Sequence, residues 1–285
     1  MSDAEWVPGC ELPSGVVAVN HLLRTHAPVS DLGWKLLDAE AAQRVQPALG
    51  ARKLVDFSGP HGWEHSATDL GRTLPLESPP NDGVSASRRR VLPLAELRAN
   101  FSVSLEELGD HDRGALNPDL ASLDDAARRI AVAENVAVFH GWEAAEFTGV
   151  TGASPHGAEP LGDDAESYSR AVAGAVEKLL RSGVSGPYGL ALGRKQYRRV
   201  VETAEHGGCL LLDHLRKILG GPIVWSPGVE GAVVMSLRGE DYIFDCGQDL
   251  AIGYDTHDSG TVDLYIVESF SFLVATPEAA VALAA

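Results

Sequence analysis

The chain has 285 residues, of which 45% are hydrophobic and 22% are charged, a balance typical of a soluble protein with a substantial core. Its formal net charge of -17 argues against a protein whose main task is to bind nucleic acid, because neutralising phosphates requires clustered Lys and Arg. The only basic run, Arg88–Arg90, is too short to alter that conclusion.

No apolar run approaches the roughly 18 residues of a membrane span. The acidic N-terminus lacks the basic-then-apolar pattern of a signal peptide, so we expect a cytoplasmic protein. The three cysteines, Cys10, Cys209 and Cys246, are far apart and form no CxxC pair. They therefore predict neither a disulfide framework nor a cysteine zinc site.

In chain order, residues 1–19 carry Pro and Gly at short spacing and are expected to form a poorly ordered N-terminal extension. A helix is predicted to begin at Ser30–Asp31, an N-cap followed by an acidic residue, and to end near Pro47. Its buried face is predicted from residues at three- and four-residue spacing: Trp34, Leu37, Ala41 and Val45. A short strand over 53–57 follows.

Residues 58–93 are rich in Gly and Pro and show little periodicity, which is uncommon for so long a segment inside a compact domain. We interpret them as an extended two-stranded arm whose tip lies near 79–83. Such an arm cannot bury its own faces and needs a neighbour to pack on, which favours oligomerisation.

A strand is predicted over 92–108, and Ser122 is expected to cap the next helix, which runs to Gly141 and is the longest of the chain. The Gly- and Pro-rich segment 142–162 indicates a boundary. The second half is expected to mix short strands and helices, at 164–181, 186–193, 194–203, 210–219, 232–237, 241–245, 261–275 and 277–285. Of these, 232–237 and 241–245 form a predicted hairpin, and 277–285 a closing helix. Without a regular βαβ repeat, the fold class is α+β.

The strand predicted over 261–275 is far longer than the usual five or six residues. Its alternate positions are apolar except for Glu268, so one face is predicted to be buried. We interpret Glu268 as the partner of an arginine on a neighbouring element, with Arg98 and Arg128 as candidates.

A search for catalytic patterns is negative: phosphate-binding loops, GxSxG and HExxH are absent. His61 and His65 are four residues apart, but in a Gly-rich segment where a shared face is not expected, so no metal site is predicted. The acidic stretch from Glu106 to Asp112 is interpreted as a solvated loop. Cys209 and His206 are separated by two glycines, which give a thiol–imidazole pair no rigid geometry.

Six stretches resemble the encapsulin shell proteins, a family formerly grouped with linocin-type bacteriocins. They occur in the family's order over roughly 22–285, and together they are highly specific. They are LLRTHAPVSDLGW (22–34), GARKLVDFSGPHGWEHSATDLG (50–71), LPLAELRANFSVSLEEL (92–108), DRGALNPDLASLDDAARRIAVAENVAVFHG (112–141), SGVSGPYGLALG (182–193) and GQDLAIGYDTHDSGTVDLYIVESFSFLVATPEA (247–279).

The resemblance implies the fold of tailed-bacteriophage major capsid proteins. A peripheral domain would comprise 20–54, 94–142 and 251–285, an extended arm 55–93, and an axial domain 143–250. Residues 1–19 would lie before the usual start of the family.

The function implied is that of a non-enzymatic subunit that self-assembles into a closed icosahedral compartment. Such shells enclose cargo enzymes, often a dye-decolourising peroxidase or a ferritin-like protein, through a C-terminal docking peptide on the cargo. Carried over by motif, the cargo-binding candidates are Arg52, Asp56, Trp34 and Leu37. For Trp34 and Leu37, ordinary core packing is an equal alternative.

The resemblance also implies that a loop of the axial domain lines a fivefold pore. The matching residues are Glu205, His206, Gly207 and Gly208. Some members of the family bind flavin between aromatic residues near the arm and in this loop. Here the two regions read SASRRRVLPL and AEHGGC and contain no aromatic residue, so no cofactor is predicted.

Two other interpretations stay open. One is a phage or prophage major capsid protein, which would have the same fold but enclose DNA. The other is a small soluble hydrolase or bacteriocin, which would act as a monomer.

Overall fold

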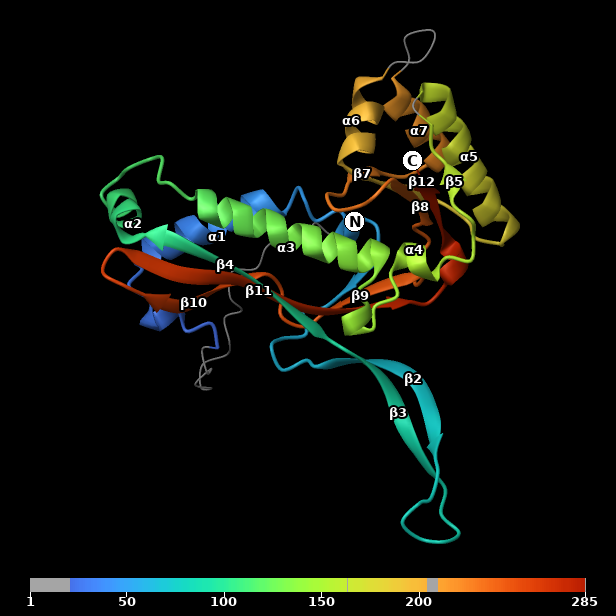
Figure 1. Ribbon diagram of the computed structural model, residues 1–285, viewed down its shortest axis with the longest axis horizontal. Coiled ribbons are helices and arrows are strands. Elements are labelled where there is room, and N and C mark those ends of the chain that lie inside the picture. Colours follow the sequence, from blue (N-terminus) through green and yellow to red (C-terminus); the bar gives the residue numbers. More distant parts are fainter. Residues whose placement is uncertain (1–20, 163, 204–209, 285) are drawn as a thin grey trace.

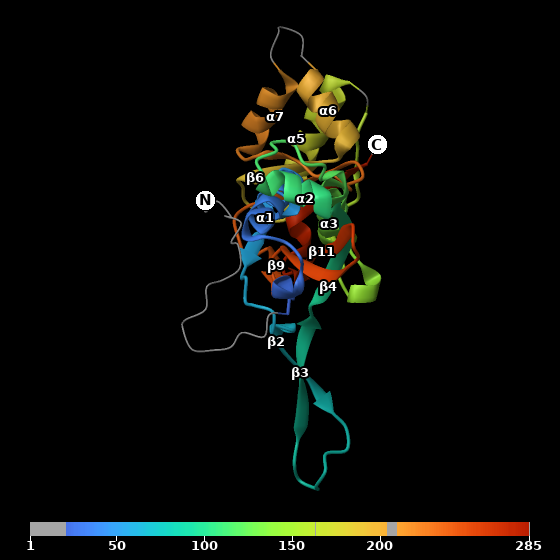
Figure 2. The ribbon, with the colours of Figure 1, turned by 90° about the vertical axis from the view of Figure 1, so that its left-hand side faces the viewer.

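A computed structural model describes residues 21–162, 164–203 and 210–284. Figure 1 shows an elongated body, a group of helices at one end of it, and a long two-stranded arm that points away from those helices. A view from the side, in Figure 2, shows the same separation of helices and arm. Both helices and strands are mixed along the chain, which confirms the α+β class.

The first sheet has five strands and is organised around the long strand β11, Thr261–Val274. Along Val262–Val267, β11 lies between two antiparallel partners, and its end at Phe270–Val274 pairs with a third. The first two partners are β4 (Ala95–Ser104) and β10 (Ala251–His257), and the third is β9 (Tyr242–Cys246). The fifth strand, β1 (Asp56–Ser58), pairs with β9. The predicted long strand is therefore confirmed within one residue.

Three helices accompany this sheet: α1 (Asp31–Val45), α2 (Leu105–Asp112) and α3 (Ala121–His140). The Ser30 side chain accepts a hydrogen bond from the backbone N–H of Gly33, as expected of an N-cap. The apolar faces of α1 and α3 pack with β4, β10 and the first half of β11 into one buried cluster, in which Leu37, Leu123 and Ile266 are fully buried.

The second sheet also has five strands, in the order β5-β12-β8-β6-β7. Every residue of β6 (Tyr188–Leu192) and β8 (Ala232–Ser236) is buried, as expected of central strands covered on both faces. The edge and neighbouring strands are β5 (Glu159–Pro160), β7 (Ile223–Trp225) and β12 (Ala280–Ala284). Helices accompany it: α4 (Val150–Ala153), α5 (Ala165–Arg181), α6 (Arg194–Glu202) and α7 (Leu211–Leu219).

The arm is a two-stranded antiparallel sheet of β2 (Ala67–Leu76) and β3 (Ala86–Pro93). An irregularity between Asp69 and Arg72 shifts its register. Figure 1 shows it leaving the body beneath β9 and β11. Short 3₁₀ turns complete the chain: η1 (Arg24–His26), η2 (Ala51–Lys53), η3 (Glu143–Ala145) and η4 (Pro277–Ala279). Within the described ranges, no helix has both the length and the apolar character that crossing a bilayer requires.

The structure corrects the predicted end of the chain. Residues 277–285 were expected to form a helix because they are rich in Ala, but β12 pairs with β8 from Ala280 to Leu283. Val281 and Leu283 are buried by that pairing. The local preference for helix is overridden because the edge of β8 offers backbone partners and an apolar surface.

The predicted hairpin of 232–237 and 241–245 is also wrong. The two strands exist, but β8 belongs to the second sheet and β9 to the first. Leu237–Asp241 therefore connects the two sheets, and Arg238 pairs with Asp241 in it at 2.9 Å. A short polar connection looks alike in sequence whether its strands pair or separate.

Two predictions about where helices begin differ from the structure. The strand predicted over 92–108 ends at Ser104, whose side chain accepts from the N–H groups of Glu106 and Glu107 and so begins α2. The acidic stretch that follows is thus helical and not a loop. Ser122 lies inside α3 and does not cap it; its hydroxyl donates to the Ser102 carbonyl.

Candidate functional site

A buried ion-pair cluster joins three separate parts of the body around Arg52. The Arg52 side chain, which is only 8% exposed, donates to Glu134 on α3 at 2.7 Å, to Asp249 at 2.7 Å and to Glu268 on β11 at 2.8 Å. Glu134 and Glu268 are both fully buried. Burial alone would lower the pKa of Arg52, but the charges of Glu134, Glu268 and Asp249 raise it well above its ordinary value. Arg52 therefore holds η2, α3 and β11 together as a permanent cation.

One guanidinium cannot balance two buried carboxylates and a third, partly exposed one. Burial, followed by the charge of Glu134, raises the pKa of Glu268 well above its ordinary value, and burial also raises that of Glu134. Oε1 of Glu134 and Oε1 of Glu268 are buried and have no hydrogen-bond partner. We infer that Glu268 keeps a proton that it donates to Glu134.

The prediction that Glu268 pairs with an arginine is confirmed, but the partner is Arg52 and not Arg98 or Arg128. The guanidinium of Arg98 stacks on the ring of Tyr265 at 3.7 Å and pairs with Asp255 at 3.1 Å. Arg128 pairs with Asp125. Glu134 was not predicted as a partner, although an acid among the apolar residues in the second half of α3 was a usable signal.

The four residues predicted to bind a partner peptide occupy different environments. Leu37 is fully buried in the core, and Arg52 is held by three carboxylates. Trp34 is partly buried under the guanidinium of Arg24, which lies 4.1 Å from its ring, and Asp56 is exposed and accepts from the Glu240 N–H. Only Trp34 and Asp56 thus offer surface to a partner.

Apolar side chains are also exposed around η1 and at the start of α1. Leu23 and Leu32 are 44% and 54% exposed, one before η1 and the other at the start of α1. Lys35 and Ala39, one and two turns after Leu32, are also exposed, while Leu36 is partly buried. The outer face of α1 therefore combines one accessible leucine, Leu32, with a lysine.

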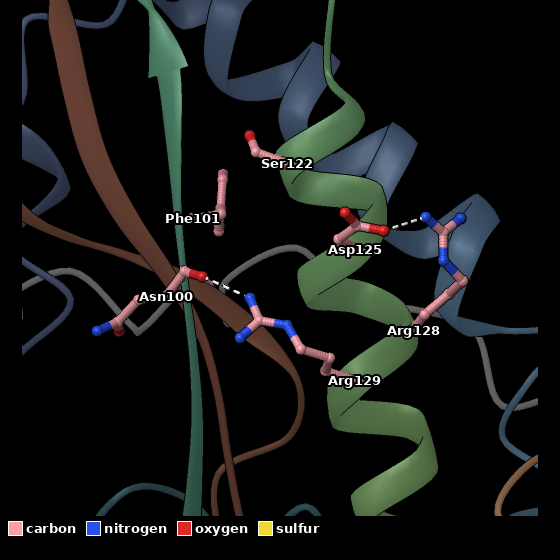
Figure 3. Close-up of a pocket in the computed structure, with 6 residues that line it drawn as sticks. All are labelled: Asn100, Phe101, Ser122, Asp125, Arg128 and Arg129. Carbon is pink, nitrogen blue, oxygen red and sulfur yellow. Dashed lines mark hydrogen bonds and ion pairs between the residues drawn. The ribbon is translucent and has the colours of Figure 1, made fainter.

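A shallow pocket of about 390 Å³ lies between β4 and α3. Figure 3 shows Arg129 reaching from α3 to donate to the carbonyl of Asn100 at 2.8 Å, while Arg128 turns to Asp125. Phe101 and Ser122 complete the lining. The two arginines that line it therefore both have partners within the subunit.

The surface of the arm is almost entirely exposed, and part of that surface is apolar. Leu74, Leu76, Val84 and Val91 are each 40–53% exposed, and Arg88–Arg90 line β3 as exposed residues. An isolated two-stranded sheet is marginally stable in water. The arm thus has the properties of a segment that packs on another molecule.

The structure brings together His61 and His65, which were not expected from their sequence positions to share a face. Nε2 of His61 lies 3.0 Å from Oδ1 of Asp245, and Nε2 of His65 lies 3.0 Å from Oδ2 of the same carboxylate. Burial acts to raise the pKa of Asp245, but hydrogen bonds from His65 and Thr68 outweigh it and hold the pKa below its ordinary value. The expectation that the two histidines share no face is therefore wrong.

The predicted pore residues, Glu205, His206, Gly207 and Gly208, lie outside the described residues, as do Cys10 and Cys209. Cys246 is buried on β9, and burial raises the pKa of its thiol far above the usual range. A buried thiol of this kind is inert.

Comparison with known proteins matches nearly the whole chain to one family. The family model described as an encapsulating protein for peroxidase matches residues 19–271. The type 1 encapsulin shell protein of Rhodospirillum rubrum is 42% identical over 270 residues, which cover 93% of this chain and 96% of that protein. The corresponding protein of Rhodococcus erythropolis is 40% identical over 268 residues, covering 93% and 100%.

Solved structures extend the similarity to the fold. A virus-like particle from Pyrococcus furiosus matches with a TM-score of 0.61 and 19% identity, over 88% of this chain and 98% of that one. The capsid of the Myoviridae phage XM1 matches with a TM-score of 0.51 and 12% identity, over 81% and 89%. At such low identity, these matches identify the fold alone. The chain belongs to the family of encapsulin shell proteins and has the fold of tailed-phage capsid proteins.

Proposed function

We propose that this protein is a non-enzymatic cytoplasmic shell subunit that assembles with copies of itself into a closed icosahedral compartment around a cargo enzyme. The observation that carries the proposal is the arm, which extends from the body with both faces exposed. A neighbouring subunit would cover Leu74 and Leu76, and the apolar area buried at each arm would be multiplied over every contact of the shell.

Assembly is tested by substituting the apolar residues of β2. The double variant Leu74→Asp, Leu76→Asp should shift the purified protein from large particles to small species in size-exclusion chromatography with light scattering. A charge buried at a subunit contact is costly, whereas the same charge in an isolated arm remains solvated.

The matched control is Leu180→Asp on α5, because Leu180 is an exposed leucine of the body, at 59%. We expect this variant to form particles like the wild type. Normal particles from the arm variant would overturn the role given to the arm.

For cargo, we propose that the outer face of α1 binds the C-terminal docking peptide of an enzyme, such as a dye-decolourising peroxidase or a ferritin-like protein. Support comes from the exposed Leu23 and Leu32, before η1 and at the start of α1, and from Trp34 of the same helix, which is only partly buried. Asp56 would supply a polar contact, while Leu37 would act from the core by fixing the position of α1. Arg52 is not included, because a contact with the peptide would require it to leave its three carboxylates.

Docking is tested by co-expressing the shell with a fluorescent protein that carries the C-terminal segment of a candidate cargo. Leu32→Glu should reduce the fluorescence retained in purified particles by tenfold or more, with particles still formed. Leu116→Glu is the control, because Leu116 is 96% exposed in the α2–α3 connection. Equal loading of the two variants would contradict the assignment of the α1 face.

The enclosure of DNA is the second candidate, since capsids of tailed phages share the fold. Mass spectrometry and nuclease-protected absorbance of natively purified particles distinguish the two. A co-purifying enzyme without nucleic acid supports the compartment, and protected DNA supports the capsid.

A further inference from the structure

We propose that His61, His65 and Asp245 form a binding site for a divalent transition-metal ion, with zinc as its best-suited occupant, at the base of the arm. The three side chains offer two imidazole nitrogens and a carboxylate oxygen that all lie within 4.8 Å of one another. Two imidazoles and one carboxylate are an established ligand set for Zn²⁺ with an open fourth position.

The carboxylate is fixed by the first sheet. Asp245 lies on β9, between Ser58 of β1 and Ser271 of β11 in the strand register, and is 6% exposed. The Thr68 hydroxyl donates to Oδ2 of Asp245. A ligating carboxylate oriented by such a hydrogen bond has the outer support that metal sites in proteins usually show.

The two imidazoles are fixed by the loop between β1 and β2. The backbone N–H groups of His61 and Gly62 each donate at 2.9 Å, to the carbonyls of Cys246 and Gly247 just after Asp245. The N–H of His65 donates to the Gly62 carbonyl at 3.1 Å and closes the turn. Gly62 adopts a φ of 103°, a conformation that favours glycine, so this turn is encoded in the sequence.

The geometry needs only a side-chain adjustment to close around an ion. A tetrahedral Zn²⁺ with bonds of about 2.0–2.1 Å separates its ligand atoms by about 3.3 Å. The Nε2 atoms already lie 3.0 Å from the two carboxylate oxygens. The side chains of His61 and His65 are 43% and 28% exposed, so rotation of their rings can move the Nε2 atoms by the required distance of about 1 Å. The Ser58 hydroxyl, 3.0 Å from Nε2 of His61, or a water molecule would take the fourth position.

An ion at this position would link the root of the arm to the body. The loop 59–66 leads directly into β2, whereas Asp245 belongs to the sheet beneath the core. Binding in the folded state alone stabilises that state by mass action, so the ion should raise the unfolding temperature of the subunit.

The test uses the full-length protein, freed of metal by dialysis against a chelator. Titration with Zn²⁺ by calorimetry, together with metal analysis after desalting, should give one ion per subunit. Co²⁺ should give the visible absorption bands of a tetrahedral site. Zn²⁺ should also raise the midpoint of thermal unfolding.

The double variant His61→Ala, His65→Ala removes two exposed or half-exposed side chains and is expected to fold, whereas Asp245→Asn tests the buried ligand. Both should lose the stoichiometric ion, the cobalt bands and the thermal shift. His26→Ala, which removes an exposed histidine of η1, should keep all three. Absence of stoichiometric binding by the wild type, or unchanged binding by the double variant, would overturn the proposal and leave the triad as a hydrogen-bonded cluster only.

Discussion

At the scale of single residues, a polar residue in an apolar strand correctly predicted a buried ion pair, but it did not identify the partner. Glu268 was predicted to pair with an arginine, and it does, but Arg52 lies 216 positions away. No local spacing connects η2, α3 and β11, so the identity of the partners depends on the fold. The same holds for His61 and His65, whose meeting depends on a loop held by the backbone of β9.

If Glu268 carries the inferred proton, replacing it with the neutral glutamine should change the stability of the cluster only a little. Glu268→Gln should keep the acceptor for Arg52 and a donor for Glu134, so its free energy of unfolding should fall by about 1 kcal/mol or less. Arg52→Met leaves two buried carboxyls without a cation and should cost roughly 3–5 kcal/mol. Thermal and denaturant unfolding measure both, and equal losses would contradict the inferred proton.

The cluster also predicts a dependence of stability on pH. Because the pKa of Glu268 in the folded protein lies above its ordinary value of 4.5, the folded state holds a proton that the unfolded state has released. Its contribution to stability should therefore decline as pH rises from about 4.5 through the raised pKa.

Unfolding midpoints of the wild type and of Glu268→Gln, measured across this range, should converge or cross in favour of the variant at higher pH. Glu177→Gln serves as a control, since Glu177 is exposed on α5. Parallel curves for the wild type and Glu268→Gln would contradict the raised pKa.

At the scale of elements, local sequence patterns located a helix or strand wherever its structure did not depend on a distant part of the chain. The starts of α1 and β11 were located within a residue, since N-cap chemistry and strict alternation are local. The strands β8 and β9 were located too, but not their separation into two sheets. The alanine-rich end failed because a sheet edge decided its structure.

The strand β12 offers a prediction at this scale. Val281 is fully buried and pairs with Val234 of β8, so Val281→Asp should destabilise the subunit by roughly 3 kcal/mol or more. Ala284→Asp, at the exposed end of the same strand, should cost less than about 0.5 kcal/mol. Denaturant unfolding compares them, and a similar small loss for both would argue against the burial of β12.

At the scale of the whole molecule, the arm was foreseen from composition, and the architecture from the resemblance of six stretches to one family. Composition alone indicated that residues 58–93 could not form a core of their own, and β2 and β3 are indeed exposed on both faces. The cover that we propose for the arm is another copy of the chain, and a single sequence or subunit does not contain such a contact.

We propose that this chain closes into a shell whose arms pack on neighbouring subunits. Cryo-electron microscopy of particles purified from cells that express the chain tests it most directly. We expect hollow icosahedral particles in which Leu74 and Leu76 of each arm are buried against an adjacent subunit. A 30.2 kDa monomer in solution, or closed particles whose arms remain free in solvent, would contradict it.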